Sequence, residues 1–174
     1  RARSSSDCAS LVKSAFSAHL GREFSVHALK FQDHGPKITL VIPTKDHCDL
    51  LRTCIDSILA KTSYRDYRIL VIDNDSVLAE SREYFSELAR HPQVDVTTIS
   101  NPPGGGFNYA HINNVAVQQC DAELVCFLNN DTEIVEPGWL SQLAGVARNE
   151  QVGSAGALLF YPNMVVQHSG IRFG

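Results

Sequence analysis

From Lys37 onward, short apolar or β-branched runs alternate with longer amphipathic stretches, and this alternation restricts the possible folds more than any other feature. The runs have the Val, Ile and Leu content of strands that are buried on both faces of a sheet. The stretches between them place apolar residues at helical spacing. Strands separated by helices predict right-handed crossovers and a mainly parallel sheet, so the predicted fold class is α/β. The predicted strands are residues 38–43, 69–72, 94–99 and 124–128, and the predicted helices are residues 46–62, 78–90 and 108–120.

The composition is that of a soluble globular domain: 174 residues, of which 44% are hydrophobic and 20% charged. With 15 Lys and Arg against 19 Asp and Glu, the net charge of -4 argues against a nucleic-acid partner. No apolar stretch reaches the roughly 20 residues of a membrane span. The five cysteines form no Cys-x-x-Cys pair, and we interpret them as reduced, which predicts a cytoplasmic location.

The first 36 residues stand apart from this pattern. We predict that residues 1–36 form an appendage or linker that is partly helical, because Leu11, Ala15 and Ala18 have roughly helical spacing. The alternation then occupies residues 37–174. Because the chain begins without Met and stops shortly after an apolar run, we expect it to be part of a longer polypeptide.

Polar or glycine-rich segments follow every predicted strand. In order they read "PTKD", "DND", "NPPGGGFN" and "NNDTE". Each alone is typical of a turn. The carboxyl ends of parallel strands lie at one edge of a sheet, where ligands of open α/β folds bind, so together the four segments predict a binding site. We also expect Asp46 to cap the helix that follows the first strand.

Two common nucleotide motifs are missing from these strand ends. A dinucleotide site needs G-x-G-x-x-G after the first strand, where this chain has "PTKDHC". The segment "GGGFNYAH" lacks the Lys-Ser/Thr ending of a phosphate-binding P-loop. The aspartates suggest a different chemistry. Asp73 can accept a hydrogen bond from the imide nitrogen of uracil or thymine, and Asp131 suits a divalent cation that prefers oxygen ligands.

Four segments in this order resemble the family 2 glycosyltransferases with a GT-A fold: "ITLVIPTKD", "ILVIDNDS", "GGGFNYAHINNVAV" and "FLNNDTEIVEPGWLSQL". The resemblance is greatest to bacterial enzymes similar to rhamnosyltransferases of surface-polysaccharide assembly, and it covers residues 37–174. It implies inverting transfer of a sugar from a nucleotide-diphosphate donor to an acceptor hydroxyl, with divalent Mn or Mg on the diphosphate. A saccharide or lipid-linked saccharide is the implied acceptor.

The resemblance also implies roles for individual residues. Asp73 matches the acid that contacts the base, and Asn129 with Asp131 match the ends of the Asp-x-Asp element that meets ribose and metal. Glu133 and His168 are further candidates, His168 for a contact near the diphosphate. The implied nucleotide-binding residues are Pro43, Thr44, Asp46, Asp73, Asn113, Asn129 and Asn130, and the implied metal ligand is Asp131.

Two departures from the family pattern change these expectations. Asn129 stands where the family has an acid, so we expect metal to depend on Asp131 and the diphosphate. The general base of the family is expected after Gly174, in the acceptor part of the domain. We therefore expect residues 1–174 alone to bind nucleotide without catalysing transfer, and any contact with the inner face of the cell membrane to come from other parts of the protein.

Two alternatives from other functional classes remain open. One is a non-catalytic nucleotide-sugar-binding or scaffold domain of a larger protein, which the uncharged Asn129 favours. The other is a nucleotidyltransferase, which would normally present a glycine-rich loop with a basic residue after the first strand. The segment "PTKDHC" contains no glycine, which counts against this second alternative.

Overall fold

The computed structural model describes residues 10–17 and 23–170 and divides the chain into two compact units. Residues 35–137 form one unit, and the described residues of 10–34 and 138–170 form the other. The first unit contains a four-stranded parallel sheet in the order β5-β4-β3-β6. Its strands are β3 (Ile38–Thr44), β4 (Tyr67–Asp73), β5 (Val94–Thr98) and β6 (Leu124–Phe127), which confirms the predicted α/β class.

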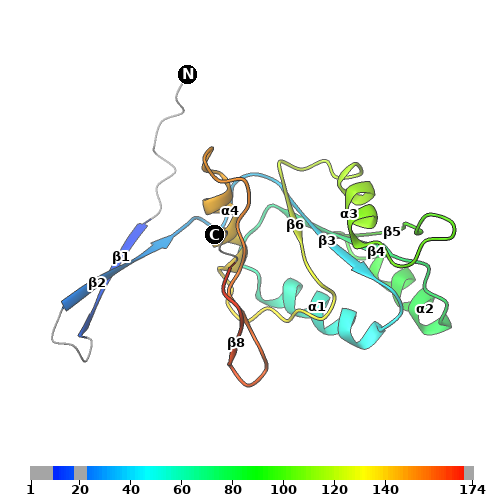
Figure 1. The fold of residues 1–174 in the computed structure, drawn as a ribbon, viewed down its shortest axis with the longest axis horizontal. Coiled ribbons are helices and arrows are strands. Elements are labelled where there is room, and N and C mark those ends of the chain that lie inside the picture. Colours follow the sequence, from blue (N-terminus) through cyan, green and yellow to red (C-terminus); the bar gives the residue numbers. More distant parts are fainter. Residues whose placement is uncertain (1–9, 18–22, 171–174) are drawn as a thin grey trace. The chain divides into compact units, whose positions relative to one another are not determined.

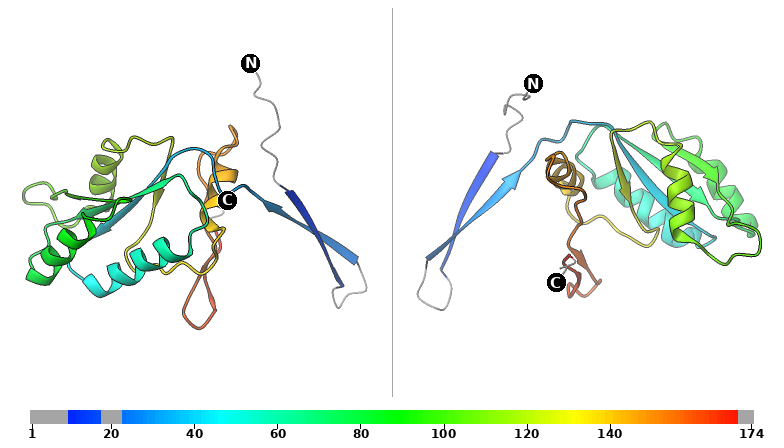
Figure 2. Two further views of the ribbon diagram at one scale, coloured as in Figure 1. Left: turned by 180° about the vertical axis from the view of Figure 1, so that it is seen from behind. Right: turned by 45° about the horizontal axis from the view of Figure 1, so that its top comes forward.

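Helices cover both faces of this sheet. The helices are α1 (Cys48–Lys61), α2 (Ala79–Leu88) and α3 (Tyr109–Val117). Figure 1 shows α1 and α2 on one face and α3 on the other, and Figure 2 shows the same arrangement from behind. The two crossovers through α1 and α2 add strands on one side of β3, whereas the crossover through α3 places β6 on its other side. The strand order therefore reverses between β3 and β6.

The core follows from the apolar runs of the sequence. All seven residues of β3 are buried, as expected for the central strand of a sheet covered on both faces. A cluster joins the sheet to α3, and its burial is the main favourable contribution to the stability of this face. The buried members of the cluster are Val41, Leu70, Ile72, Ile99, Ile112 and Ala116.

The ladder between β3 and β6 stops early, and this shapes the carboxyl end of the sheet. The last paired residues are Val41 and Phe127, followed by a hydrogen bond from the Leu128 amide to the Val41 carbonyl (3.0 Å). On its other side, β3 continues alongside β4 as far as Thr44, which pairs with Asp73. Past Val41, β3 therefore has a strand partner on one side only.

The second unit contains a hairpin of β1 (Ser10–Ser17) and β2 (Glu23–Lys30), the helix α4 (Trp139–Ala147) and a short pair of β7 (Leu159–Phe160) with β8 (Val166–His168). The helix α4 has close contacts with the segment after β2. The Ser141 hydroxyl donates to Asp33 (2.6 Å), and Gly145 lies so close to the Phe31 ring that a Cβ there would overlap it.

The predicted helix near the amino terminus is wrong. Residues 10–17 form β1, which pairs antiparallel with β2 over its full length. Spacing alone suggested a helix, but Phe24, Val26 and Ala28 alternate in sequence with polar residues, as strand residues do. Pairing with that second segment overrides the weak local preference of the first. Residues 18–22, which contain the rest of the predicted helix and its expected end at Gly21, lie outside the described part of the chain.

Candidate nucleotide-binding site

A cavity of about 570 Å³ lies at the carboxyl end of the sheet, where the strand order reverses between β3 and β6. Such switch points are where ligands of open α/β sheets bind. Its residues come from the end of β3 and the turn after it, from the start of α3 and the loop before it, and from the segment after β6, so three regions distant in sequence meet there. The cavity is lined by Pro43, Thr44, Lys45, Asp46, His47, Phe107, Tyr109, Asn129 and Asn130.

The turn between β3 and α1 forms one wall of this cavity. Asp46 and His47 both have φ of 53°, a left-handed conformation that non-glycine residues rarely adopt. The expectation that Asp46 caps α1 is wrong, because His47 is the N-cap residue and no side chain caps this helix. The Asp46 Oδ1 instead accepts hydrogen bonds at the start of α2, from the Leu78 amide (3.0 Å) and the Ser81 hydroxyl (3.0 Å) among others. These donors, the Leu78 amide first, hold the pKa of the Asp46 carboxyl below its usual value.

The segment after β6 forms another wall and carries the predicted metal ligand. The Thr132 amide donates to the Asn129 carbonyl (3.3 Å), closing a turn that contains Asn130 and Asp131. The Asn130 amide group donates to the Thr44 hydroxyl (3.0 Å), which joins this wall to the end of β3. The Asp131 side chain is exposed at the turn. The turn therefore presents a carboxylate to solvent next to the cavity-lining Asn129 and Asn130.

One face of α1 supports the segment after β6 at three points. The Cys54 thiol donates to the Asn129 carbonyl (3.7 Å), and the Ser57 hydroxyl accepts from the Ile134 amide (2.9 Å). Lys61 forms an ion pair with the candidate Glu133 (3.0 Å). Burial raises the pKa of the Cys54 thiol to about 12. This thiol is thus a neutral packing group at neutral pH.

Asparagines hold the stem of the glycine-rich loop. Asn74 is buried, donates to the Ile99 carbonyl (2.8 Å) and accepts from Asn101 (2.9 Å). Asn101 in turn accepts from the amide of Asn108 (2.8 Å), the side chain of which caps α3. The two ends of the loop are thereby fixed relative to the ends of β4 and β5. Gly104 has φ of 75°, a backbone conformation that suits glycine.

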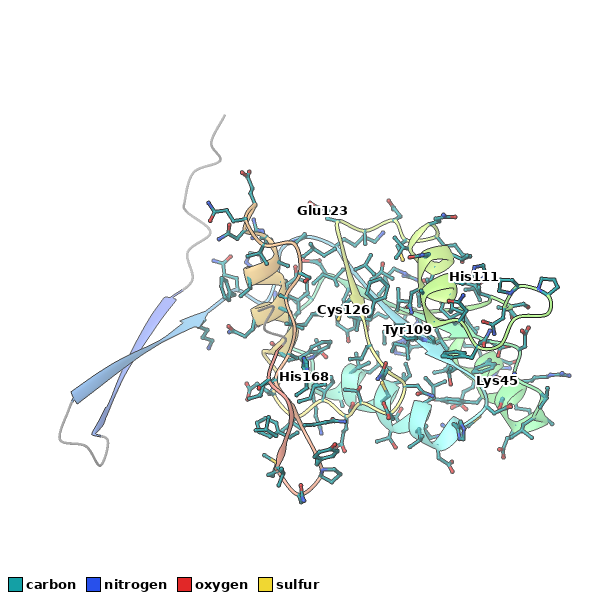
Figure 3. All side chains as sticks on the ribbon, viewed as in Figure 1. Lys45, Tyr109, His111, Glu123, Cys126 and His168 are labelled. Atoms are coloured by element: carbon teal, nitrogen blue, oxygen red, sulfur yellow. The ribbon has the colours of Figure 1, made fainter. Side chains whose placement is uncertain are left out.

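This loop and the first residue of α3 bring two exposed aromatic rings to the cavity, and sequence reasoning missed both. Phe107 and Tyr109 are 68% and 43% exposed, and their ring centroids lie 6.5 Å apart. Figure 3 labels Tyr109 and Lys45 at the carboxyl end of the sheet and Glu123 at the opposite end. An aromatic residue directly after three glycines was the available signal, because a loop residue without a strand or helix pattern has no reason to be buried.

Not every predicted contact lines the cavity. The described residues that line the cavity do not include Asp73, Asn113 or Asp131. The Asp73 carboxylate accepts from the Ser76 amide (2.8 Å). Asn113 is buried and donates to the Tyr109 carbonyl (2.8 Å), while its Oδ1 has no hydrogen-bond partner among the described residues. His168 ends β8 in the other unit. The ligand contacts of these four residues, like those of the residues that line the cavity, remain predictions.

Within the described residues, no three His, Cys, Asp or Glu side chains gather in a way that could hold a metal by themselves. Asp131 and the amide oxygen of Asn129 are oxygen donors of the kind that Mg²⁺ or Mn²⁺ accepts. Such a partial set fits a cation that also takes ligands from a bound phosphate.

The family profile described as "Glycosyl transferase family 2" matches residues 39–170, which is most of the chain. The chain belongs to glycosyltransferase family 2. This family 2 chain is also similar in sequence to two bacterial proteins. It is 38% identical over 152 residues to the uncharacterized protein y4gI of Sinorhizobium fredii and 40% identical over 139 residues to the O-antigen biosynthesis protein RfbC of Myxococcus xanthus. These alignments cover 87% and 80% of the chain but only 16% and 10% of the relatives' lengths.

Solved structures show the same fold as this family 2 chain. The mannosyltransferase PcManGT of Pyrobaculum calidifontis, solved with GDP-Man and Mn²⁺, has a TM-score of 0.57 at 19% identity, covering 68% of this chain and 34% of its own. TarS of S. aureus, residues 1–349, has a TM-score of 0.53 at 20% identity, covering 70% of this chain and 38% of its own. A structure of the same TarS fragment contains UDP. The predicted GT-A fold is confirmed.

Among the helices of the described residues, none combines the length and apolar character of a membrane span.

Proposed function

We propose that this family 2 domain transfers a sugar from a nucleotide-diphosphate donor to a hydroxyl of a saccharide or lipid-linked saccharide, with inversion, in bacterial surface-polysaccharide synthesis. The observation that carries the proposal is the cavity at the switch point between β3 and β6, which is lined by five of the predicted nucleotide contacts. Similarity to an O-antigen biosynthesis protein supports the polysaccharide context.

The walls of the cavity suit the two ends of a nucleoside diphosphate. Phe107 and Tyr109 offer faces on which a planar ring can stack. Asn129 and Asn130 offer amide groups, and the exposed Asp131 lies in the same turn. In this arrangement the nucleoside lies against the β3 end and the glycine-rich loop, and the diphosphate points toward the turn after β6.

Asp131 is the proposed ligand for a divalent cation that the diphosphate brings with it. Such a cation stabilises the charge that develops on a departing diphosphate. Asp131 supplies a carboxylate, and Asn129 an uncharged oxygen, so the chain alone is expected to hold metal weakly. In the single displacement, the acceptor oxygen forms a bond to the anomeric carbon as the bond from that carbon to the diphosphate breaks. A general base outside the residues assigned here takes the hydroxyl proton, and the chain holds the leaving nucleoside diphosphate in place.

Calorimetric titration of UDP, dTDP and GDP, each with and without Mn²⁺, tests this proposal. We expect binding that is tighter with Mn²⁺ and weaker in the variants Asp73→Ala and Asp131→Ala. Absence of binding by all three nucleotides, or binding that neither variant changes, would contradict the nucleotide site.

A non-catalytic nucleotide-sugar-binding domain is the second candidate, and the uncharged Asn129 favours it. Both candidate functions predict that the chain binds nucleotide. They differ in whether the sugar of the donor is transferred or hydrolysed. Hydrolysis or transfer of labelled sugar by the longest available form of the protein separates them. Loss of this activity in Asp131→Ala supports catalysis, whereas activity that Asp131→Ala leaves unchanged supports the binding role.

A further inference from the structure

Asp46 connects the cavity wall to a helix that does not line the cavity. Its Oδ1 accepts three hydrogen bonds at the start of α2, from the amides of Val77 (3.1 Å) and Leu78 (3.0 Å) and the hydroxyl of Ser81 (3.0 Å). Its own amide donates to the hydroxyl of Ser76 (2.8 Å). Main chain and side chain of one residue thus bind the same short segment, residues 76–81.

These contacts hold a turn with an unfavourable backbone. Asp46 and His47 are consecutive non-glycine residues with φ of 53°, and such conformations persist where the surroundings enforce them. Both residues line the cavity. If the contacts to α2 were lost, the turn could relax toward ordinary backbone angles, and the wall that it forms would change shape.

The same contacts extend to the other wall. The Thr44 hydroxyl donates to the Asp46 carbonyl (3.2 Å) and accepts from Asn130 (3.0 Å). On the α2 side, Ser81 is fully buried and also accepts from the Cys48 thiol (3.3 Å). A continuous set of hydrogen bonds therefore runs from the turn after β6, through the end of β3, to the amino end of α2.

We propose that Asp46 is a positioning residue: its carboxylate fixes the turn of residues 44–47 to the start of α2 and so sets the shape of the cavity. This inference rests on the proposed nucleotide site and changes the role of one of its predicted members. Asp46 then acts through the three hydrogen bonds that its Oδ1 accepts and not through contact with the ligand.

Two substitutions separate this role from direct contact with ligand. Asp46→Asn keeps an oxygen acceptor at the Oδ1 position, whereas Asp46→Ala removes it. We expect Asp46→Asn to keep the UDP affinity within about threefold and Asp46→Ala to lower it by roughly tenfold, comparable to the loss of a helix cap. Because the wall does not depend on metal, the loss should be the same with and without Mn²⁺. Equal losses in the two variants, or unchanged affinity in Asp46→Ala, would overturn the inference.

A second measurement does not depend on ligand. Amide hydrogen exchange of Val77 and Leu78 should accelerate in Asp46→Ala and remain near the wild-type rate in Asp46→Asn. Ser81→Ala should cause a smaller change in the same direction, and Ser86→Ala, which removes a hydroxyl bonded only within α2, should cause none. If the wild-type chain binds no nucleotide, the proposed function fails, and the exchange rates alone decide whether Asp46 holds the turn. Unchanged exchange rates of Val77 and Leu78 in Asp46→Ala would refute the positioning role.

Discussion

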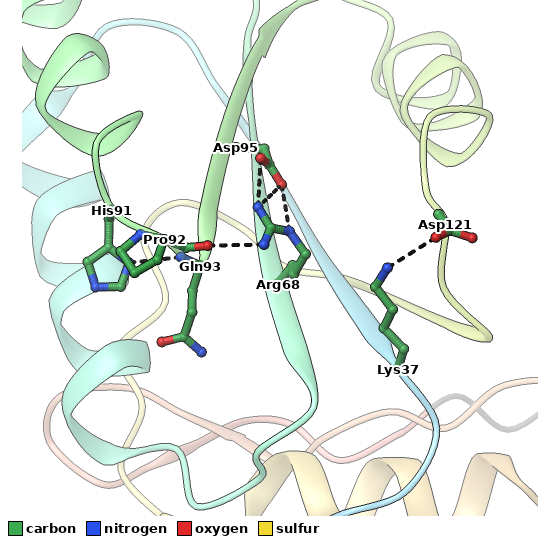
Figure 4. Close-up of polar contacts among 7 residues, drawn as sticks. All are labelled: Lys37, Arg68, His91, Pro92, Gln93, Asp95 and Asp121. Atoms are coloured by element: carbon green, nitrogen blue, oxygen red, sulfur yellow. Dashed lines mark hydrogen bonds and ion pairs between the residues drawn. The ribbon is translucent and has the colours of Figure 1, made fainter.

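The carboxylates at the two ends of the four-stranded sheet have different kinds of partner. At the amino end, Asp95 forms an ion pair with Arg68 (2.8 Å), and Asp121 forms one with Lys37 (3.2 Å), as Figure 4 shows. At the carboxyl end, Asp46 and Asp73 accept hydrogen bonds from amides and hydroxyls.

This difference separates a structural end from the end that we propose binds nucleotide, called the binding end below. A cation within the chain neutralises each paired aspartate at the amino end, whereas amides and hydroxyls orient a carboxylate without removing its charge. Negative charge is thereby retained at the carboxyl end, where the exposed Asp131 lies next to the cavity. We infer that the carboxyl end is arranged for a cation that comes from outside the chain.

The largest expected effect comes from removing charge at the binding end. Asp131→Ala should weaken UDP binding in Mn²⁺ by about 10- to 100-fold, about 1.4 to 2.8 kcal/mol, because the cation loses its carboxylate ligand. Asp121→Ala, an equivalent change at the amino end, should leave binding unchanged. Calorimetry on both variants checks the contrast, and equal effects would remove the distinction between the two ends.

A smaller effect is expected from the contacts of α1 that support the turn containing Asp131. Ser57→Ala leaves the buried amide of Ile134 without its acceptor, which should destabilise the segment after β6 by about 1 to 3 kcal/mol. We expect the gain in UDP affinity that Mn²⁺ provides to shrink about fivefold, while affinity without metal stays unchanged.

The matched control for this variant is Ser141→Ala, which removes another buried, hydrogen-bonded serine hydroxyl, from α4. Calorimetry with Mn²⁺ or EDTA, alongside thermal unfolding, measures both effects. Equal losses of affinity in Mn²⁺ and in EDTA would show that Ser57 supports the fold and does not position Asp131.

A third test uses pH to examine how the binding end holds its carboxylates. Because hydrogen bonds lower the pKa of Asp46 in the folded chain, its contribution to stability is present above the unfolded pKa of 3.8 and is lost as pH falls through the lowered folded value. Asp46→Asn should therefore flatten the acid side of the stability curve below about pH 4. Urea titrations across this range measure the slope, and parallel curves for variant and wild type would contradict the assignment.

The smallest effect should come from the structural end. Arg68→Met should cost at most about 1 kcal/mol of unfolding free energy, because the pair with Asp95 is about half exposed. The cost should decrease in high salt, since ions screen exposed charges. Denaturant unfolding at two salt concentrations measures it, and a large cost independent of salt would show that this pair does more than a surface ion pair.

The sequence predicted the strands and helices of residues 37–120 well because their apolar periodicity is strong and local. It failed at residues 10–17, where the strand forms by pairing with a second segment. The sequence also predicted that Asp46 caps the nearest helix, α1. The carboxylate instead accepts hydrogen bonds at the start of α2, which begins more than thirty residues later. Neither error could be corrected from local spacing, because each depends on a partner distant in sequence.

By itself, the sequence determined the α/β alternation, the polar strand ends and the family resemblance, because side-chain periodicity and short motifs are properties of neighbouring residues. The tertiary structure decided that β6 lies beside β3 and that their ladder ends early. It also decided that Phe107 and Tyr109 face the same cavity as Asn129. The physical reason is that strand order and loop contacts arise from packing between distant segments, which no local pattern specifies.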